Sequence, residues 1–254
     1  MLKFRRIKRS DRRGADTVTE EKFAILFHAT FHVGSNEIVL VARTLSLPIV
    51  VIVHGNQEAN ASASILWDNA FAQRGRMLFQ GEFKVTRDAW TIISQLVPEK
   101  VPWSGLVKTL SMKWSRELNS KFGLSHRAIN FLGQKIFRGH AFTEDTLVTW
   151  SMFNRENMPG RTFTFWQWFD SVMALMKHKL CVNYWNDHAV VGFIDRRECQ
   201  QILQSQPHGT FLMRFSDSEL GALSVRILQF YGNDLGVHLF FSSMQICTTV
   251  KFNI

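Results

Sequence analysis

The sequence predicts a mixed, multi-domain fold with a β-rich first part, an α-helical middle part and a final part that combines a helix with strands. Between Phe23 and Val53 the apolar residues alternate with other residues, the period of two that is typical of strands. Between Trp103 and Met176 they recur every three or four residues, as in helices that pack through one face. With 254 residues, 46% of them hydrophobic, the chain is long enough for two or three domains.

Composition favours an intracellular protein that does not insert into a membrane. The first residues, Met1 to Arg6, hold no apolar run, so we expect no signal peptide. The longest apolar run, Ile49 to Val53, is far too short to span a bilayer. The three cysteines (Cys181, Cys199 and Cys247) lack the spacing of a metal site and fit reduced thiols better than a disulfide framework.

Positive charge is concentrated at the start of the chain. Residues 1–13 carry seven lysines and arginines against Asp11 alone, a net charge of +6. From Asn186 onward five basic residues face six acidic ones, a net charge of −1. The basic start fits either contact with the phosphates of duplex DNA or a solvated tail or nuclear-localisation patch. An anion site in the last part must therefore be local.

No motif in the sequence indicates catalysis. A strand that ends in His54-Gly55 could suggest the oxyanion loop of an α/β-hydrolase, but the Gly-x-Ser-x-Gly elbow of that fold occurs nowhere in the chain. Nucleophile–base pairs, metal clusters, phosphate-binding glycine loops and kinase signatures are also lacking. We expect neither enzymatic activity nor a cofactor.

The first part reads as consecutive strands. Alternating residues from Phe23 to Val33 precede Gly34-Ser35-Asn36, a good sequence for a tight turn. A strand over Ile38–Val41 and a buried-looking run over Ile49–Val53 follow, with no helical period between them. This succession is typical of a β-sandwich or barrel.

The middle part predicts three helices. The first begins near Trp103 and is stopped by Gly123, and the second is capped by Ser125 and ends near Gly139. The third carries an aromatic stripe, with Phe165, Trp166, Trp168, Phe169, Val172 and Met176. Such a stripe is core in most proteins, so its predicted role is structural.

The final part contains the strongest candidate site. Asp195 followed by Glu198 predicts a capped helix that runs to about Leu203, with Arg196 in its first turn. A strand follows, in which Leu212 and Arg214 share one face. Burial of a guanidinium without a partner is costly, and its fork of donors suits a phosphate, although a strand arginine can also be ion-paired or exposed.

The amino-acid sequence around Arg214 resembles that of a known family. The segment Gly209-Thr210-Phe211-Leu212-Met213-Arg214-Phe215-Ser216-Asp217-Ser218-Glu219-Leu220-Gly221 resembles the second strand and phosphate loop of a Src-homology-2 (SH2) domain. Among SH2 domains, the segment most closely resembles those of the STAT family, the signal transducers and activators of transcription. The resemblance implies that Arg214, Arg196, Ser216 and Ser218 bind phosphotyrosine.

Earlier blocks resemble the same family, in family order. Arg6–Phe23, Ser46–Gln57 and Leu66–Phe71 are similar to the second part of the STAT DNA-binding domain, an immunoglobulin-like β-barrel. Within this family, these segments are most similar to the branch that contains the mammalian fifth and sixth members and the insect protein. Phe163–Asp170 is similar to the helical linker. The resemblance places five residues at the DNA: Lys8, Arg9, Asp11, Arg12 and His54.

Together these blocks predict three domains. Residues 1–99 would be part of the β-barrel, 100–184 an all-α linker and 185–254 a truncated α+β SH2 domain. The resemblance lapses over 80–97 and ends near residue 228, after a strand at Ala222–Ile227, without the later strands, second helix and tail tyrosine of the family. We therefore expect a partial chain.

By resemblance, the full protein is a DNA-binding transcription factor activated by tyrosine phosphorylation in cytokine and JAK-type signalling. It would move from cytoplasm to nucleus, and its partners would be duplex DNA, phosphotyrosine peptides of receptors and a second STAT chain. Alternatively, the chain is a truncated phosphotyrosine-binding module that interferes with signalling because it cannot form an active dimer on DNA.

Overall fold

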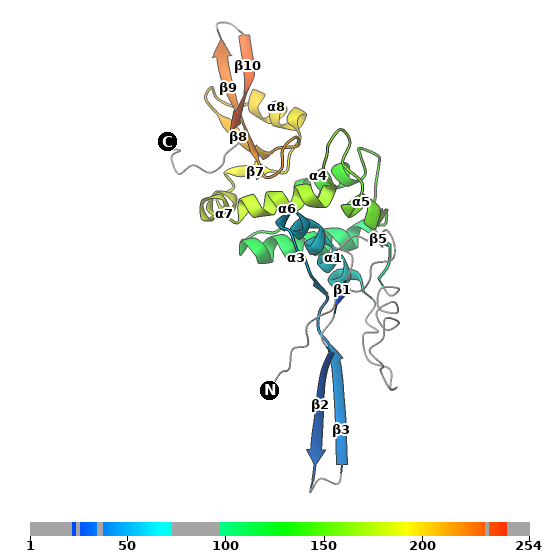
Figure 1. The fold of residues 1–254 in the computed structure, drawn as a ribbon. Helices are drawn as coiled ribbons and strands as arrows, with labels where there is room; N and C mark the ends of the chain where they lie inside the picture. The colour runs from blue at the N-terminus through cyan, green and yellow to red at the C-terminus, as the bar shows by residue number, and fades with distance from the viewer. Residues whose placement is uncertain (1–21, 24–25, 35–37, 73–96, 232–233, 243–254) are drawn as a thin grey trace. The chain divides into compact units, whose positions relative to one another are not determined.

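The computed structural model describes residues 22–23, 26–34, 38–72, 97–231 and 234–242 (Figure 1). The chain divides into two compact units, residues 1–97 and residues 98–254, each with its own internal contacts. Each unit is described by itself below.

Two short sheets and a helix make up the described part of the first unit. Strand β1 (Lys22–Phe23) pairs antiparallel with β4 (Ile49–Val50), and β2 (Leu26–Val33) pairs antiparallel with β3 (Ile38–Leu45). The single 3-10 turn η2 (Gly55–Gln57) leads into α1 (Glu58–Phe71). The predicted closed barrel is not among these described pairings, and it stays a prediction.

Two expectations for this unit were wrong. The run Ile49–Val53 is a strand only as far as Val50, and Val51, Ile52 and Val53 are exposed, because a continuous apolar run does not by itself show which face is covered. Helix α1 was not expected. It buries mostly small residues and polar groups beside Trp67, and Lys22 of β1 forms an ion pair with its buried Asp68.

The second unit begins with a helical region. Its elements are β5 (Lys100–Pro102), α3 (Trp103–Leu118), α4 (His126–Ile136), β6 (Leu147–Thr149), α5 (Trp150–Asn154), α6 (Phe165–Met176) and α7 (Lys179–Asn186). The cap at Ser125 is confirmed, since its hydroxyl accepts from the Ala128 N–H at 3.2 Å. Helix α3 ends earlier than expected, because Asn119 rather than Gly123 takes the left-handed conformation after it.

A four-stranded sheet and one helix follow. The elements are β7 (Val190–Gly192), α8 (Arg196–Gln204), β8 (Phe211–Phe215), β9 (Leu223–Tyr231) and β10 (Asp234–Ser242). The strand order is β10-β9-β8-β7, with β7 parallel to β8 and the other pairs antiparallel. Strand β10 was not expected, because the predicted family resemblance ends near residue 228. Helix α8 lies beside β8, β9 and β10 (Figure 1).

One aromatic core joins the helices to the sheet. Trp114 of α3 and Phe169 of α6 both pack against Phe193, which follows β7, and Phe193 in turn packs against Phe215 of β8 at a centroid distance of 4.7 Å. The aromatic stripe of α6 is therefore core, as predicted. Gly192 is required here, because its φ is +69° and an added Cβ would lie 2.5 Å from the Phe215 ring.

Candidate anion-binding site

The centre of the site is Arg214, in the middle of the sheet and only 1% exposed. Its neighbours across the sheet are Gly192 on β7 and Ser224 on β9. The guanidinium Nε donates to the Ile194 carbonyl oxygen at 3.0 Å, and Nη2 pairs with the Asp217 carboxylate. A guanidinium has five N–H donors, so within the described part of the chain three remain for another acceptor.

Charges of both signs act on Arg214, and that of Asp217 has the largest effect. Burial is the main factor that lowers the pKa of Arg214, the Asp217 carboxylate acts in the opposite direction, and the charges of Arg196 and Arg226 lower the pKa further. An arginine stays protonated at neutral pH in any case. The site therefore holds a buried positive charge whose local compensation is incomplete, which favours an incoming anion.

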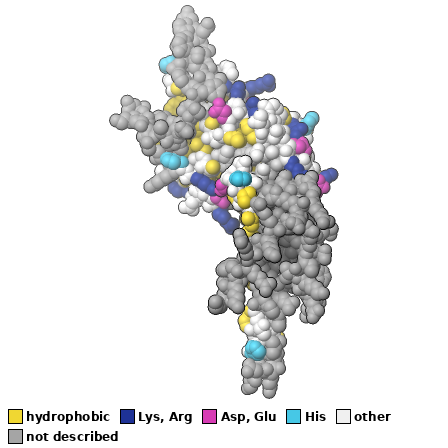
Figure 2. Space-filling view, in the orientation of Figure 1, with side chains coloured by type: hydrophobic (Ala, Val, Ile, Leu, Met, Phe, Trp, Pro, Cys, Tyr) yellow, Lys and Arg dark blue, Asp and Glu magenta, His cyan; other side chains and the backbone are white. Residues whose placement is uncertain are grey.

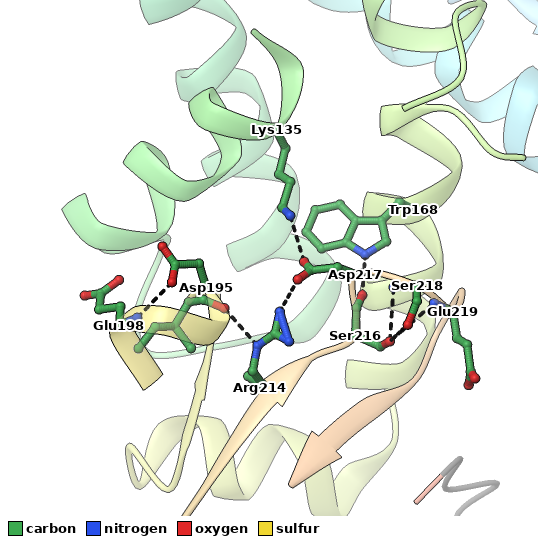
Figure 3. A network of polar contacts seen from close by, with 10 residues as sticks. Lys135, Trp168, Asp195, Glu198, Arg214, Ser216, Asp217, Ser218 and Glu219 are labelled. Atoms are coloured by element: carbon green, nitrogen blue, oxygen red, sulfur yellow. Dashed lines mark hydrogen bonds and ion pairs between the residues drawn. The ribbon is translucent and has the colours of Figure 1, made fainter. Parts of the chain in front are cut away.

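Asp217 connects the site to the helical region (Figure 3). Its second oxygen, Oδ1, lies 2.9 Å from Nζ of Lys135 on α4, as an ion pair without the alignment of a hydrogen bond. One carboxylate thus bridges Lys135 and Arg214, and it takes a position on the guanidinium that a phosphate oxygen could also take.

The loop after β8 is built around the Ser216 hydroxyl. Its Oγ accepts from the backbone N–H groups of Ser218 at 3.3 Å and Glu219 at 3.2 Å, and it lies 3.3 Å from the Ser218 hydroxyl (Figure 3). These N–H and O–H groups converge on the Ser216 Oγ. Turns in which successive N–H groups point to one spot are concave and can hold anions.

Helix α6 holds the same loop from the other side. The indole N–H of Trp168 donates to the Ser216 carbonyl oxygen at 2.8 Å, and the Ser171 hydroxyl accepts from the Gly221 N–H at 3.0 Å. Trp168 is fully buried, so this bond is made away from water. The loop geometry therefore depends on the helical region.

The start of α8 supplies a further cation. Asp195 caps the helix by accepting from the Glu198 N–H at 2.8 Å, but the Glu198 side chain pairs with Arg127 instead of completing the expected capping box. Arg196 is the first helical residue and is exposed. Within the described residues its side chain makes neither a hydrogen bond nor an ion pair, so it is available at a helix N-terminus that favours anions.

The four predicted residues thus fall into two pairs. Arg214 and Arg196 interact through their charges, and the hydroxyls of Ser216 and Ser218 meet in the loop. Sequence reasoning missed Asp217 as the partner of Arg214. A carboxylate three residues after a buried arginine was the available signal, whereas the approach of Lys135 could not be seen without the fold.

The predicted DNA contacts are only partly described. His54 is exposed just before η2, where its carbonyl oxygen accepts from the Gln57 N–H at 3.0 Å. Lys8, Arg9, Asp11 and Arg12 lie outside the described residues.

Three family models match the chain in order. The STAT DNA-binding domain matches residues 1–52, the STAT linker domain residues 91–169 and the SH2 domain residues 190–238. The chain belongs to the STAT family. It is 42% identical over 228 residues to signal transducer and activator of transcription 6 from Homo sapiens. That match covers 88% of this chain but only 25% of the relative, so the chain spans about a quarter of that STAT protein.

The described residues on one face of this STAT chain are chemically mixed. On the face in Figure 2, lysine and arginine side chains are interspersed with acidic and apolar ones, and the described residues of this face form no broad patch of one sign. Among the described residues, no helix is long and apolar enough to cross a membrane, and no group of His, Cys, Asp or Glu could hold a metal ion.

Proposed function

We propose that this STAT chain carries the phosphotyrosine-reading and DNA-contacting parts of a transcription factor activated by tyrosine phosphorylation. The observation that carries the proposal is the buried guanidinium of Arg214, with N–H donors to spare, next to a loop whose N–H and O–H groups surround Ser216. A phosphate on an extended peptide is the ligand that such a fork of donors fits.

The binding step would exchange one anion for another. A phosphate oxygen pairs with Arg214 in place of Asp217, Arg196 approaches from the start of α8, and hydroxyls of Ser216 and Ser218 hold a second oxygen. The released Asp217 keeps its ion pair with Lys135. Phosphotyrosine suits this exchange because its charge, about −1.5 to −2 at pH 7, exceeds that of a carboxylate.

The remaining parts of the proposal rest on family membership and charge. Lys8, Arg9, Asp11 and Arg12 contact duplex DNA, a role supported by the basic start and by the DNA-binding family model over residues 1–52. His54 joins them on the family resemblance and on its exposed position just beyond that match. The domain limits at 99/100 and 184/185 belong to this proposal. So do recruitment to receptors in JAK-type signalling, pairing with a second STAT chain and movement from cytoplasm to nucleus.

A peptide titration tests the central claim. The 254-residue chain should bind a tyrosine-phosphorylated peptide and not its unphosphorylated counterpart, as measured by calorimetry. Arg214→Ala should abolish this preference, because removal of one partner of a buried charge pair costs about 2–5 kcal/mol. Arg197→Ala is the matched control, since Arg197 is exposed on the same region of α8. Equal affinity of the native chain for both peptides, or an unchanged affinity in Arg214→Ala, would refute the assignment.

A further inference from the structure

A second arginine of the sheet, Arg226 on β9, is buried without a partner. The side chain is 7% exposed, and its Nε is enclosed with no hydrogen-bond acceptor. The enclosed atom without a hydrogen-bond partner is Nε, and among the described residues no carboxylate forms an ion pair with Arg226. This differs from Arg214, which has both a carbonyl oxygen and a carboxylate.

The strand register places Arg226 on the same face of the sheet as Arg214. Arg214 is opposite Ser224, and Leu212 is opposite Arg226. Cross-strand partners share a face, and so do residues two apart on one strand, so these four side chains lie on one face. Leu212 packs with Ile194, Cys199 and Leu203, which shows that this is the face covered by α8.

The pKa shifts of Cys199 and Arg214 agree with this placement of the two arginines. Burial raises the pKa of the Cys199 thiol, and the charges of Arg226 and Arg214 both act in the opposite direction. Arg226 also contributes to the lowered pKa of Arg214. The charges of both guanidinium groups thus act on the same α8 thiol, in agreement with the shared face given by the strand register.

An arrangement of this kind is unfavourable without an anion. Desolvation of an unpaired guanidinium is costly, and like charges in a low-dielectric region repel. Asp217 is already divided between Arg214 and Lys135, so it does not offset Arg226. Such an uncompensated charge indicates a site whose balance is completed by a ligand.

We propose that Arg226 is a second buried arginine of the phosphate site, and that with Arg214 it makes the site selective for a doubly charged phosphate monoester. This inference rests on the proposed phosphotyrosine binding. Two guanidinium groups on one face match a dianion, whereas a single buried arginine is already neutralised by one negative charge.

Sulfotyrosine provides a sharp probe, because it has the shape of phosphotyrosine with a single negative charge. Peptides that carry phosphotyrosine, sulfotyrosine or plain tyrosine are titrated into the native chain, Arg226→Met, Arg226→Lys and the control Arg197→Met. Arg226→Met keeps an unbranched, apolar stem and removes the guanidinium and its charge. It should bind the phosphopeptide at least about tenfold more weakly and lose much of the preference over sulfotyrosine.

Arg226→Lys keeps the charge, so its affinity for the phosphopeptide should lie between those of the native chain and Arg226→Met. The affinity of Arg197→Met should stay within about twofold of the native value. A second readout is the Tm of the ligand-free chain, which Arg226→Met should raise because it removes an unpaired buried cation.

Three outcomes overturn the inference. A native affinity and preference in Arg226→Met would leave Arg214 as the site and remove Arg226 from it. A lower Tm with an unchanged phosphate-to-sulfate preference would make Arg226 a structural residue. If the native chain does not prefer the phosphopeptide over plain tyrosine, the proposed function fails first and the inference falls with it.

Discussion

Trp168 serves the core and the candidate site with one side chain. Its ring packs against Phe131 and Phe193, while its N–H binds the carbonyl oxygen of Ser216. The sequence predicted the packing from the period of α6. It gave no indication of the hydrogen bond, because the acceptor is a backbone atom 48 residues further along the chain.

A pair of tryptophan substitutions separates these two contributions. Trp168→Phe should lower the free energy of unfolding by about 1–3 kcal/mol more than Trp114→Phe does, because it leaves the buried Ser216 carbonyl oxygen without its hydrogen-bond donor. Trp114 is an apt control, since it is fully buried and its Nε1 has no hydrogen-bond partner. Urea unfolding measures both. Equal losses would mean that the Ser216 bond adds nothing to stability.

Substitution of Asp217 should strengthen phosphopeptide binding, whereas substitution of Arg214 should weaken it. Asp217→Asn should tighten phosphopeptide binding by up to about fivefold, because the carboxylate competes with phosphate for Arg214. Glu219→Gln removes the same charge from an exposed neighbour and should change affinity less. Weaker binding by Asp217→Asn would show instead that the carboxylate holds Arg214 in its binding position.

Local chemistry explains which individual residues could be predicted. Caps at Ser125 and Asp195 involve atoms three residues apart, and the structure confirms both. The strand pattern left open whether Arg214 is buried or exposed, and the structure buries it. The missing partner of Arg226 depends on how β8, β9 and α8 assemble, which no local pattern contains.

Helices α3 and α6 are joined at the surface by a carboxylate between two lysines. Glu117 of α3 lies 2.7 Å from Lys177, just after α6, and 3.1 Å from Lys113 of its own helix. The hydrogen bond from Lys177 is the main factor that lowers the pKa of Glu117 below its ordinary value of 4.5. Because the folded-state pKa is the lower one, this pair stabilises the fold above pH 4.5 and the stabilisation is lost as the pH falls through the folded pKa.

Glu117→Gln should therefore lower the Tm slightly at pH 7 and flatten its decline on acidification below pH 4.5. Thermal unfolding at pH 7 and at successively lower pH compares the variant with the native chain. If the two Tm curves stay parallel down to acid pH, Glu117 does not link stability to protonation.

Length together with a visible apolar period or cap decides which helices were predicted. Helices α3, α4, α6 and α8 have at least nine residues and a clear period or cap, and all were expected. Helix α5, with five residues, is too short to show a period, and α1 is rich in alanine and serine, whose small side chains hide the apolar face. Strand β10 was missed because the family resemblance was expected to end near residue 228, which was wrong: the SH2 family model continues to residue 238.

The proposed DNA contacts of Arg9 and Arg12 rest on the sequence, because these residues lie outside the described part of the chain. In a duplex DNA titration at several salt concentrations, the double variant Arg9→Ala and Arg12→Ala should bind more weakly. The log–log salt slope should fall by about one unit per lost phosphate contact. Lys251→Ala removes a charge from the other end of the sequence and serves as the control. A native slope in the double variant would place these arginines away from the DNA.

The aromatic core shared by helices and sheet also sets an order of events during synthesis. Trp114 and Phe169 leave the ribosome before Phe193 and Phe215, the rings that cover them. Until β8 has emerged, these two rings lack Phe215 and the sheet that complete their packing in the folded chain. Translation of the strand that carries Arg214 is thus also the step that completes this core, and we expect a chain halted just before it to expose more apolar surface than the finished one.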